Sequence, residues 1–225
     1  MSVPFELTSY ADQLAEIARW TYRCGWAPGT STNYSVRLPA DAAPAYCAIT
    51  SSGIDKERLG AEHILAVDST GRAVGGSPLT PSAETALHLM LYRSTHAGAV
   101  FHTHSMAATL LSQAAREEGR VSLSGWELLK GLEGITSHEH EVVLPVFPNS
   151  QNIPALASMI EPLLTTSSSP PYGFLLAGHG LYVWGKDVGT AKRHLEVLEY
   201  LLQCEREARS HGHSSHTRPA GVPHE

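Results

Sequence analysis

A tight turn between two apolar runs constrains the fold of this chain more than any other feature. Residues 174–177 and 181–184 consist of Ala, Leu, Val and aromatic side chains, and Gly178-His179-Gly180 separates them. This pattern predicts two neighbouring β-strands joined by a tight turn, with His179 at its tip. Asp187 follows as the predicted N-cap of a long helix whose apolar residues lie on one face.

The rest of the chain alternates between short strand-like and helical segments. Helices are predicted over 9–24, 82–92, 125–132 and 152–164 and from residue 105, and strands over 34–38, 46–50, 64–67, 99–101 and 142–146. These segments follow no regular parallel repeat, and no Gly-x-Gly-x-x-Gly motif follows a strand. The sequence therefore predicts a fold of mixed α and β class.

The length predicts one domain followed by a tail. At about 150 residues per domain, a chain of 225 residues is too short for two full domains. Residues 210–225 are polar, poor in apolar side chains and rich in Gly, Pro and His, so we expect a disordered tail there. We expect residues 1–209 to form the single domain, and we assign no role to the histidines of the tail.

Charge and cysteine content exclude several classes of partner and location. Sixteen Lys and Arg against twenty-two Asp and Glu give a net charge of −6, so we expect neither nucleic acid nor a membrane as a partner. No run approaches the roughly 20 apolar residues of a membrane helix, and residues 1–10 do not resemble a secretion signal. Cys24, Cys47 and Cys204 form no Cys-x-x-Cys pair, which indicates a reducing compartment and predicts a cytoplasmic protein.

Three histidines form a candidate metal site. His102 and His104 follow the predicted strand 99–101, and alternate residues of a strand point to the same side. Alone, such a pair is as often structural as metal-binding, but His179 in its glycine-flanked turn offers a third ligand. Three histidines suit zinc with one coordination position open for substrate. Glu84, at a predicted helix start, fits a fourth ligand, a substrate contact or a carboxylate favoured by the helix dipole, and composition alone favours the last.

Two small polar loops are candidate phosphate sites. Residues 29–33, which begin with Gly29, and Ser51-Ser52-Gly53 offer backbone N–H groups and hydroxyls that can bind a phosphate. A plain turn is the simpler explanation for either loop taken singly. Glu127 and Lys130 are three residues apart on a predicted helix, so they share a face and either meet a substrate together or form an ordinary surface pair.

The motifs occur together in one order that resembles the class II aldolase and adducin head family. They are Gly29-Thr-Ser-Thr-Asn33-Tyr-Ser-Val-Arg37, Ile49-Thr-Ser-Ser-Gly53, Pro81-Ser-Ala-Glu84, His102-Thr-His104-Ser and Gly178-His179-Gly180. The resemblance covers roughly residues 9–209. It implies a three-layer α/β/α domain with a mostly antiparallel central sheet, a divalent metal on the three histidines, and a cyclic homotetramer with sites near subunit boundaries.

The resemblance also implies site residues and an alternative. Asn33, Ser52, Gly53 and Ser82 fall at positions that contact phosphate in related aldolases, and we include Gly29, Glu84 and Lys130 among the candidate substrate contacts. Adducin heads keep the fold without the metal histidines, so a metal-free interaction scaffold is the alternative from another class of protein. This chain retains all three histidines.

Within the family, the stretch Gly125-Trp-Glu127-Leu-Leu-Lys130-Gly and the run Tyr182-Val-Trp-Gly185 resemble one branch. That branch dehydrates 5-methylthioribulose 1-phosphate to 2,3-diketo-5-methylthiopentyl 1-phosphate in methionine salvage. The resemblance implies one zinc per subunit that polarises the substrate, and it makes Glu127 the general acid or base, with Glu84 as its rival. An aldolase or epimerase that acts on another sugar phosphate is the alternative activity.

Overall fold

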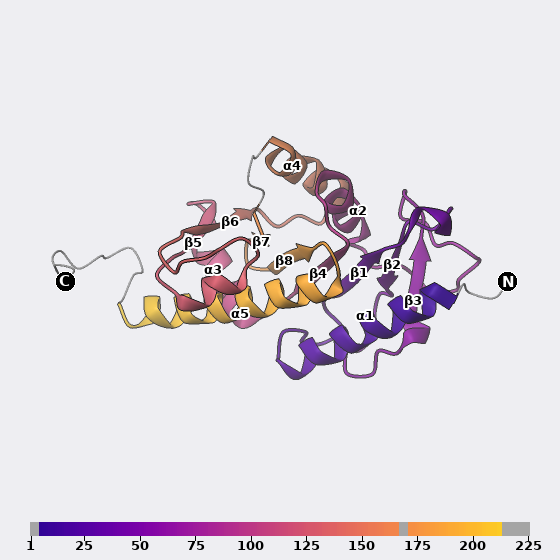
Figure 1. Cartoon of the computed structure of the whole chain (residues 1–225), viewed down its shortest axis with the longest axis horizontal. Helices are drawn as coiled ribbons and strands as arrows, with labels where there is room; N and C mark the ends of the chain where they lie inside the picture. Colours follow the sequence, from indigo (N-terminus) through magenta and orange to yellow (C-terminus); the bar gives the residue numbers. More distant parts are fainter. Residues whose placement is uncertain (1–4, 167–170, 213–225) are drawn as a thin grey trace.

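The computed structural model describes residues 5–166 and 171–212, which form a three-layer α/β/α domain around one central sheet (Figure 1). The sheet has eight strands in the order β3-β2-β1-β4-β8-β7-β6-β5. Neighbouring strands are antiparallel except for β6 and β7, which are parallel. The strands are β1 (Asn33–Arg37), β2 (Cys47–Thr50), β3 (Ile64–Val67), β4 (Ala99–Thr103), β5 (Arg120–Leu123), β6 (Val142–Phe147), β7 (Gly173–Leu176) and β8 (Gly180–Gly185).

Five α-helices cover the two faces of the sheet. They are α1 (Phe5–Arg23), α2 (Thr85–Ser94), α3 (Met106–Ala114), α4 (Ile153–Thr166) and α5 (Val188–Ser210). Short 3₁₀ helices span Ala40–Ala42 (η1), Ala61–His63 (η2) and Glu127–Gly131 (η3). Helices α1, α3 and α5 lie on one face and α2 and α4 on the other, as Figure 1 shows.

The apolar residues of the central strands alternate between two buried clusters. Phe101 and Val183 pack with α1, α3 and α5, whereas their chain neighbours Val100 and Tyr182 pack with α2 and α4. This alternation follows from the two-residue period of a strand, and it requires apolar side chains on both faces of β4 and β8. The predicted three-layer class and mostly antiparallel sheet are therefore confirmed.

The elements differ from the sequence predictions mainly at their ends. Helix α1 begins at Phe5 rather than residue 9, and strand β4 continues through Thr103. The predicted N-cap of α5 is present: the side chain of Asp187 accepts a hydrogen bond from the Thr190 N–H, 2.7 Å away. Strand β5 was not predicted, because its four residues at the sheet edge carry too short an apolar pattern.

Two further expectations concern the tail and membranes. Helix α5 extends through Ser210, and residues 213–225 lie outside the described part of the chain, where most of the predicted tail falls. Of the helices in the described residues, none combines the length and apolar character needed to cross a membrane.

Candidate metal and substrate site

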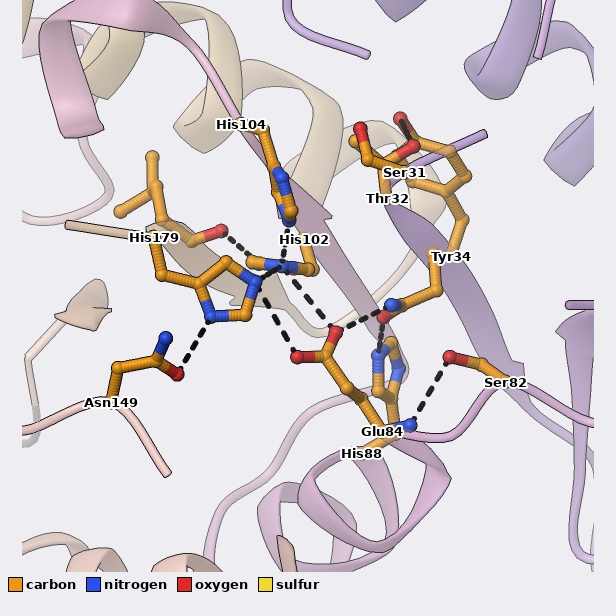
Figure 2. A network of polar contacts seen from close by, with 12 residues as sticks. Ser31, Thr32, Tyr34, Ser82, Glu84, His88, His102, His104, Asn149 and His179 are labelled. Carbon is orange, nitrogen blue, oxygen red and sulfur yellow. Dashed lines mark hydrogen bonds and ion pairs between the residues drawn. The ribbon is translucent and has the colours of Figure 1, made fainter. Parts of the chain in front are cut away.

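Three histidine rings converge beside the middle of the sheet (Figure 2). The Nε2 atom of His102, on β4, lies 2.7 Å from Nε2 of His104 and 3.3 Å from Nε2 of His179. One ring nitrogen from each residue falls within 4.8 Å of the other two. The structure therefore brings together the three histidines that the sequence analysis selected, although they come from one strand end and a turn about 75 residues further along the chain.

Backbone contacts explain how the two segments meet. Gly178 has a φ of +66°, a conformation that L side chains rarely adopt, and it begins the turn that carries His179. A Cβ on Gly180 would lie 2.0 Å from the backbone oxygen of Thr103, so only glycine allows β8 to approach β4 this closely. Glycine is thus required on each side of His179, but for a different steric reason: the backbone conformation at Gly178 and the close contact at Gly180.

Two of the three rings, those of His102 and His104, are held in the neutral form. Burial lowers the pKa of His102 well below its usual value and that of His104 to about 3, with the neighbouring rings adding to the effect. His102 Nδ1 donates to the Leu181 carbonyl at 2.9 Å, and His179 Nδ1 donates to the Asn149 side-chain oxygen at 3.2 Å. These bonds place the ring proton on Nδ1, so the lone pair on Nε2 of both rings is available to bind a metal ion. A set of three imidazole donors fits a divalent transition metal.

Glu84 faces the histidines. It is the N-cap residue of α2, but its carboxylate makes no capping hydrogen bond to the helix. Its Oε2 atom lies 3.4 Å from His102 Nε2, and its Oε1 atom lies 3.6 Å from His179 Nε2. The side-chain amide of Asn33 donates to Oε2 at 2.7 Å. The carboxylate is therefore directed toward the candidate metal site, where it could act as a ligand, contact a substrate or transfer a proton.

A buried network of side-chain hydrogen bonds holds Asn33 in place. His88 Nε2 bonds to Asn33 Oδ1 at 2.5 Å, and His88 Nδ1 bonds to the Ser35 hydroxyl at 2.6 Å. That hydroxyl also lies 2.7 Å from the Tyr92 hydroxyl. Burial lowers the pKa of His88 to about 4, so the ring is neutral near pH 7. Because every residue of this network is buried, the network fixes the orientation of the Asn33 side chain and, through it, of the Glu84 side chain.

A cavity of about 450 Å³ opens over the histidines. Both predicted phosphate loops and the start of α2 form part of its walls, and Ser51 contributes a buried hydroxyl oxygen with no hydrogen-bond partner in the described residues. The lining residues are Thr30, Ser31, Thr32, Asn33, Ser51, Ser52, Gly53, Ser82, Ala83, Glu84, His104, Asn149, Ser150, Gln151, Ile153, Pro154 and His179. Gly29 lies next to this lining but is not part of it.

Glu127 and Lys130 lie elsewhere on the surface of this chain. Glu127 begins η3, its side chain is 71% exposed, and it pairs with Lys130 and, at 3.7 Å, with His138. The bond from Lys130 lowers the pKa of the Glu127 carboxyl. Neither residue lines the cavity, so within one chain they form the surface pair that the sequence analysis held as the alternative.

Three residues around the site were not predicted from the sequence: Asn149, His88 and Lys56. Asn149 follows strand β6, and its place just beyond a strand end was a usable signal. His88 falls on the buried face of α2, where a polar residue breaks the apolar pattern. Lys56 comes shortly after the Ser51-Ser52-Gly53 loop, and no sequence pattern distinguishes it from a surface lysine.

Comparison with known proteins agrees with the fold and the motifs. Residues 12–205 match the class II aldolase and adducin N-terminal domain, and the chain belongs to this family. A solved structure of an L-fuculose 1-phosphate aldolase has a TM-score of 0.74 and 22% identity to this chain, and the match covers 99% of this chain and 92% of that one. That likeness shows the common fold.

Similar curated proteins include several methylthioribulose-1-phosphate dehydratases. A methylthioribulose-1-phosphate dehydratase from Sorangium cellulosum (strain So ce56) is 48% identical over 199 residues, which cover 88% of this chain and 91% of the relative. Another, from Xanthomonas campestris pv. campestris (strain 8004), is 48% identical over 186 residues, which cover 82% of each chain. The family expected from the motifs is thus confirmed.

Proposed function

We propose that this chain is a hydro-lyase that dehydrates 5-methylthioribulose 1-phosphate to 2,3-diketo-5-methylthiopentyl 1-phosphate. The observation that carries the proposal is the 48% identity, over nearly the full length of both chains, to a relative with that activity in its name. The complete histidine cluster supports a metal-dependent enzyme rather than a metal-free scaffold. This reaction places the chain in methionine salvage.

We infer that His102, His104 and His179 hold one zinc ion per chain. When bound, the ion supplies Lewis acidity that polarises the substrate carbonyl and favours loss of the proton on the neighbouring carbon. Burial holds the rings of His102 and His104 in their neutral form, and the bonds to Leu181 and Asn149 orient the rings of His102 and His179.

The phosphate of the substrate is assigned to the loop end of the cavity. Asn33, Ser52, Gly53 and Ser82 line this end, and the unpartnered Ser51 hydroxyl lies among them. A phosphate there would accept hydrogen bonds from hydroxyls and backbone N–H groups. The substrate carbonyl and its neighbouring hydroxyl would then extend toward the histidines and Glu84.

Proton transfer from C3 and departure of the C4 hydroxyl need an acid or base, and we assign this role to Glu127. Because Glu127 lies outside the cavity of its own chain, the assignment requires a second copy to deliver Glu127 and Lys130. A homotetramer with sites at subunit boundaries meets this requirement. Glu84 is the rival, because its carboxylate is already within 3.6 Å of two histidine nitrogens.

Product analysis tests the proposed reaction. We expect zinc-loaded protein to convert 5-methylthioribulose 1-phosphate to the diketone and to leave L-fuculose 1-phosphate and L-ribulose 5-phosphate unchanged. Release of an aldehyde or formation of an epimer from either of these sugars, without diketone from the first, would instead establish the aldolase or epimerase alternative. The position of Glu84 beside the histidines is the observation that favours that alternative.

Two glutamine substitutions test which carboxylate moves the proton. Glu127→Gln keeps the shape but removes proton exchange, so turnover should fall by about 10²-fold or more with normal zinc content. Glu84→Gln should instead alter KM or zinc affinity. Glu118→Gln, an exposed carboxylate paired with Arg120, is the control and should behave as wild type. If Glu127→Gln turns over normally while Glu84→Gln is inactive and retains zinc, Glu84 is the catalytic carboxylate.

A further inference from the structure

Lys56 is a lysine buried behind the cavity wall. Its side chain belongs to the segment between β2 and η2, and the residue is only 1% exposed. The Nζ atom donates to the Thr30 carbonyl at 3.1 Å and to the Ile54 carbonyl at 2.9 Å. Lysine is rarely buried to this extent unless its charge has a partner.

The charge of Lys56 has no ion-pair partner in the part of the chain that the structure describes. Among the described residues, no Asp or Glu oxygen lies within ion-pair distance of Lys56 Nζ. Burial accordingly lowers the pKa of Lys56 to about 8, and only Asp55 opposes the shift. An isolated ammonium ion away from water is unfavourable, and a nearby anion offsets that penalty. The two carbonyl bonds satisfy hydrogen bonding but leave the positive charge unbalanced.

The two carbonyls place this charge at the loop end of the cavity. Thr30 lines the cavity, and Ile54 follows Gly53, which lines it from the second loop. Lys56 therefore connects the two loops to which the phosphate is assigned. Its charge extends to the histidine end as well, where it contributes to the lowered pKa of His104.

We propose that Lys56 is the counter-charge for the substrate phosphate and holds the two phosphate loops at their binding separation. This inference rests on the proposed function, because it takes the cavity to be a sugar-phosphate site. It explains how a chain with a net charge of −6 can bind a dianion in a cavity whose lining contains no Lys or Arg. Lys56 is a positioning and electrostatic residue and takes no part in proton transfer.

The binding of inorganic phosphate to zinc-loaded protein, followed by calorimetry, tests the inference directly. Lys56→Met keeps the length and apolar stem of the side chain and removes its charge. We expect it to weaken phosphate binding by about tenfold or more, since a partly buried charge interacts strongly with a nearby dianion. Lys186→Met removes an exposed lysine, paired with Glu133, and should leave the affinity unchanged.

A second probe separates charge from loop structure. Acetohydroxamate binds metal centres without carrying a phosphate, so its affinity reports on the histidine end of the cavity. We expect Lys56→Met to retain that affinity while losing phosphate affinity. Equal loss of both probes would mean that Lys56 has only a structural role, and unchanged phosphate affinity would overturn the inference completely.

The pH profile of the wild-type protein supplies a readout that does not depend on folding of a variant. Deprotonation of Lys56 should by itself weaken phosphate binding by about tenfold between about pH 7 and about pH 9, because the ammonium of the unbound protein loses its proton near pH 8. The ionisation of phosphate to its dianion in the same range offsets only part of this fall. Lys56→Met should lack this component, and a wild-type affinity that stays constant across the range would contradict the inference. The charged and titratable groups around this segment are Arg19, Tyr22, Asp55, Glu57, Arg58 and His104.

Failure of the proposed function gives a different result. The assignment of phosphate to these loops is wrong if wild-type protein binds no inorganic phosphate at any pH. It is also wrong if Ser52→Glu, which places a carboxylate on a loop that lines the cavity, leaves phosphate binding unchanged. If the wild-type protein binds phosphate, and Ser52→Glu abolishes the binding while Lys56→Met does not affect it, the cavity assignment stands and the role of Lys56 is rejected.

Discussion

Burial of His88 should make the stability of this protein fall in acid, and one substitution should remove that component. Both ring nitrogens of His88 are hydrogen-bonded inside the protein, and burial lowers its pKa from 6.5 to about 4. In the unfolded chain the ring keeps its ordinary pKa. Between about pH 6.5 and about pH 4 the unfolded state therefore binds more protons than the folded state, and the free energy of unfolding decreases as the pH falls.

The size of the effect follows from the two pKa values. At about 1.4 kcal/mol per pH unit, a pKa lowered from 6.5 to about 4 corresponds to about 3 kcal/mol of stability, present near pH 7 and lost by about pH 4. This is a substantial part of the roughly 5–15 kcal/mol that stabilises a typical domain. His102 and His104 also have lowered pKa values, so the contribution of His88 must be isolated by a difference.

Urea denaturation of chelator-treated protein at several pH values measures that difference. Between about pH 7 and about pH 4, the free energy of unfolding of His88→Gln should fall by about 3 kcal/mol less than that of wild type, whatever the stability of the variant at neutral pH. His96→Gln, which replaces an exposed histidine just beyond α2, is the matched control and should follow the wild-type curve. If the free energy of unfolding of His88→Gln and of wild type falls by the same amount over this range, His88 is not held neutral in the folded protein. The buried hydrogen-bond network around Asn33 is then refuted.

Three further predictions are independent of His88. Elemental analysis should show that His179→Ala has lost most of its zinc, whereas His140→Ala, at an exposed histidine, should keep it. Full metal occupancy and activity in His179→Ala would rule out the three-histidine site. Glu199 is buried and burial raises its pKa from 4.5 to about 7, so its contribution to stability is lost as the pH rises through this window. Urea denaturation of Glu199→Gln should therefore show a gain over wild type of up to about 3 kcal/mol at about pH 8 relative to about pH 4, and equal pH dependence would contradict this. A chain that ends at Gly212 should retain turnover and assembly, measured by activity and sedimentation, because residues 213–225 have few apolar side chains; loss of either would give the tail a role.

Local patterns in the sequence were sufficient to select the three clustered histidines and most of the elements. The two-residue period of a strand places His102 and His104 on one side, and the glycines around His179 indicate a turn with unusual backbone geometry. Caps and apolar periodicity identified α5 and the central strands, because each depends on residues only a few positions apart. The short edge strand β5 lacked such a pattern and was missed.

The connections between these segments were decided by the tertiary structure. Strand β4 lies between β1 and β8, so His102 is opposite both Asn33 and Tyr182 in the sheet, a pairing that no local period encodes. The bond between Asn33 and Glu84 joins residues 51 positions apart. Folding likewise buries Lys56 behind the cavity and leaves Glu127 on the surface of its own chain, since burial depends on which elements pack together and not on residue type.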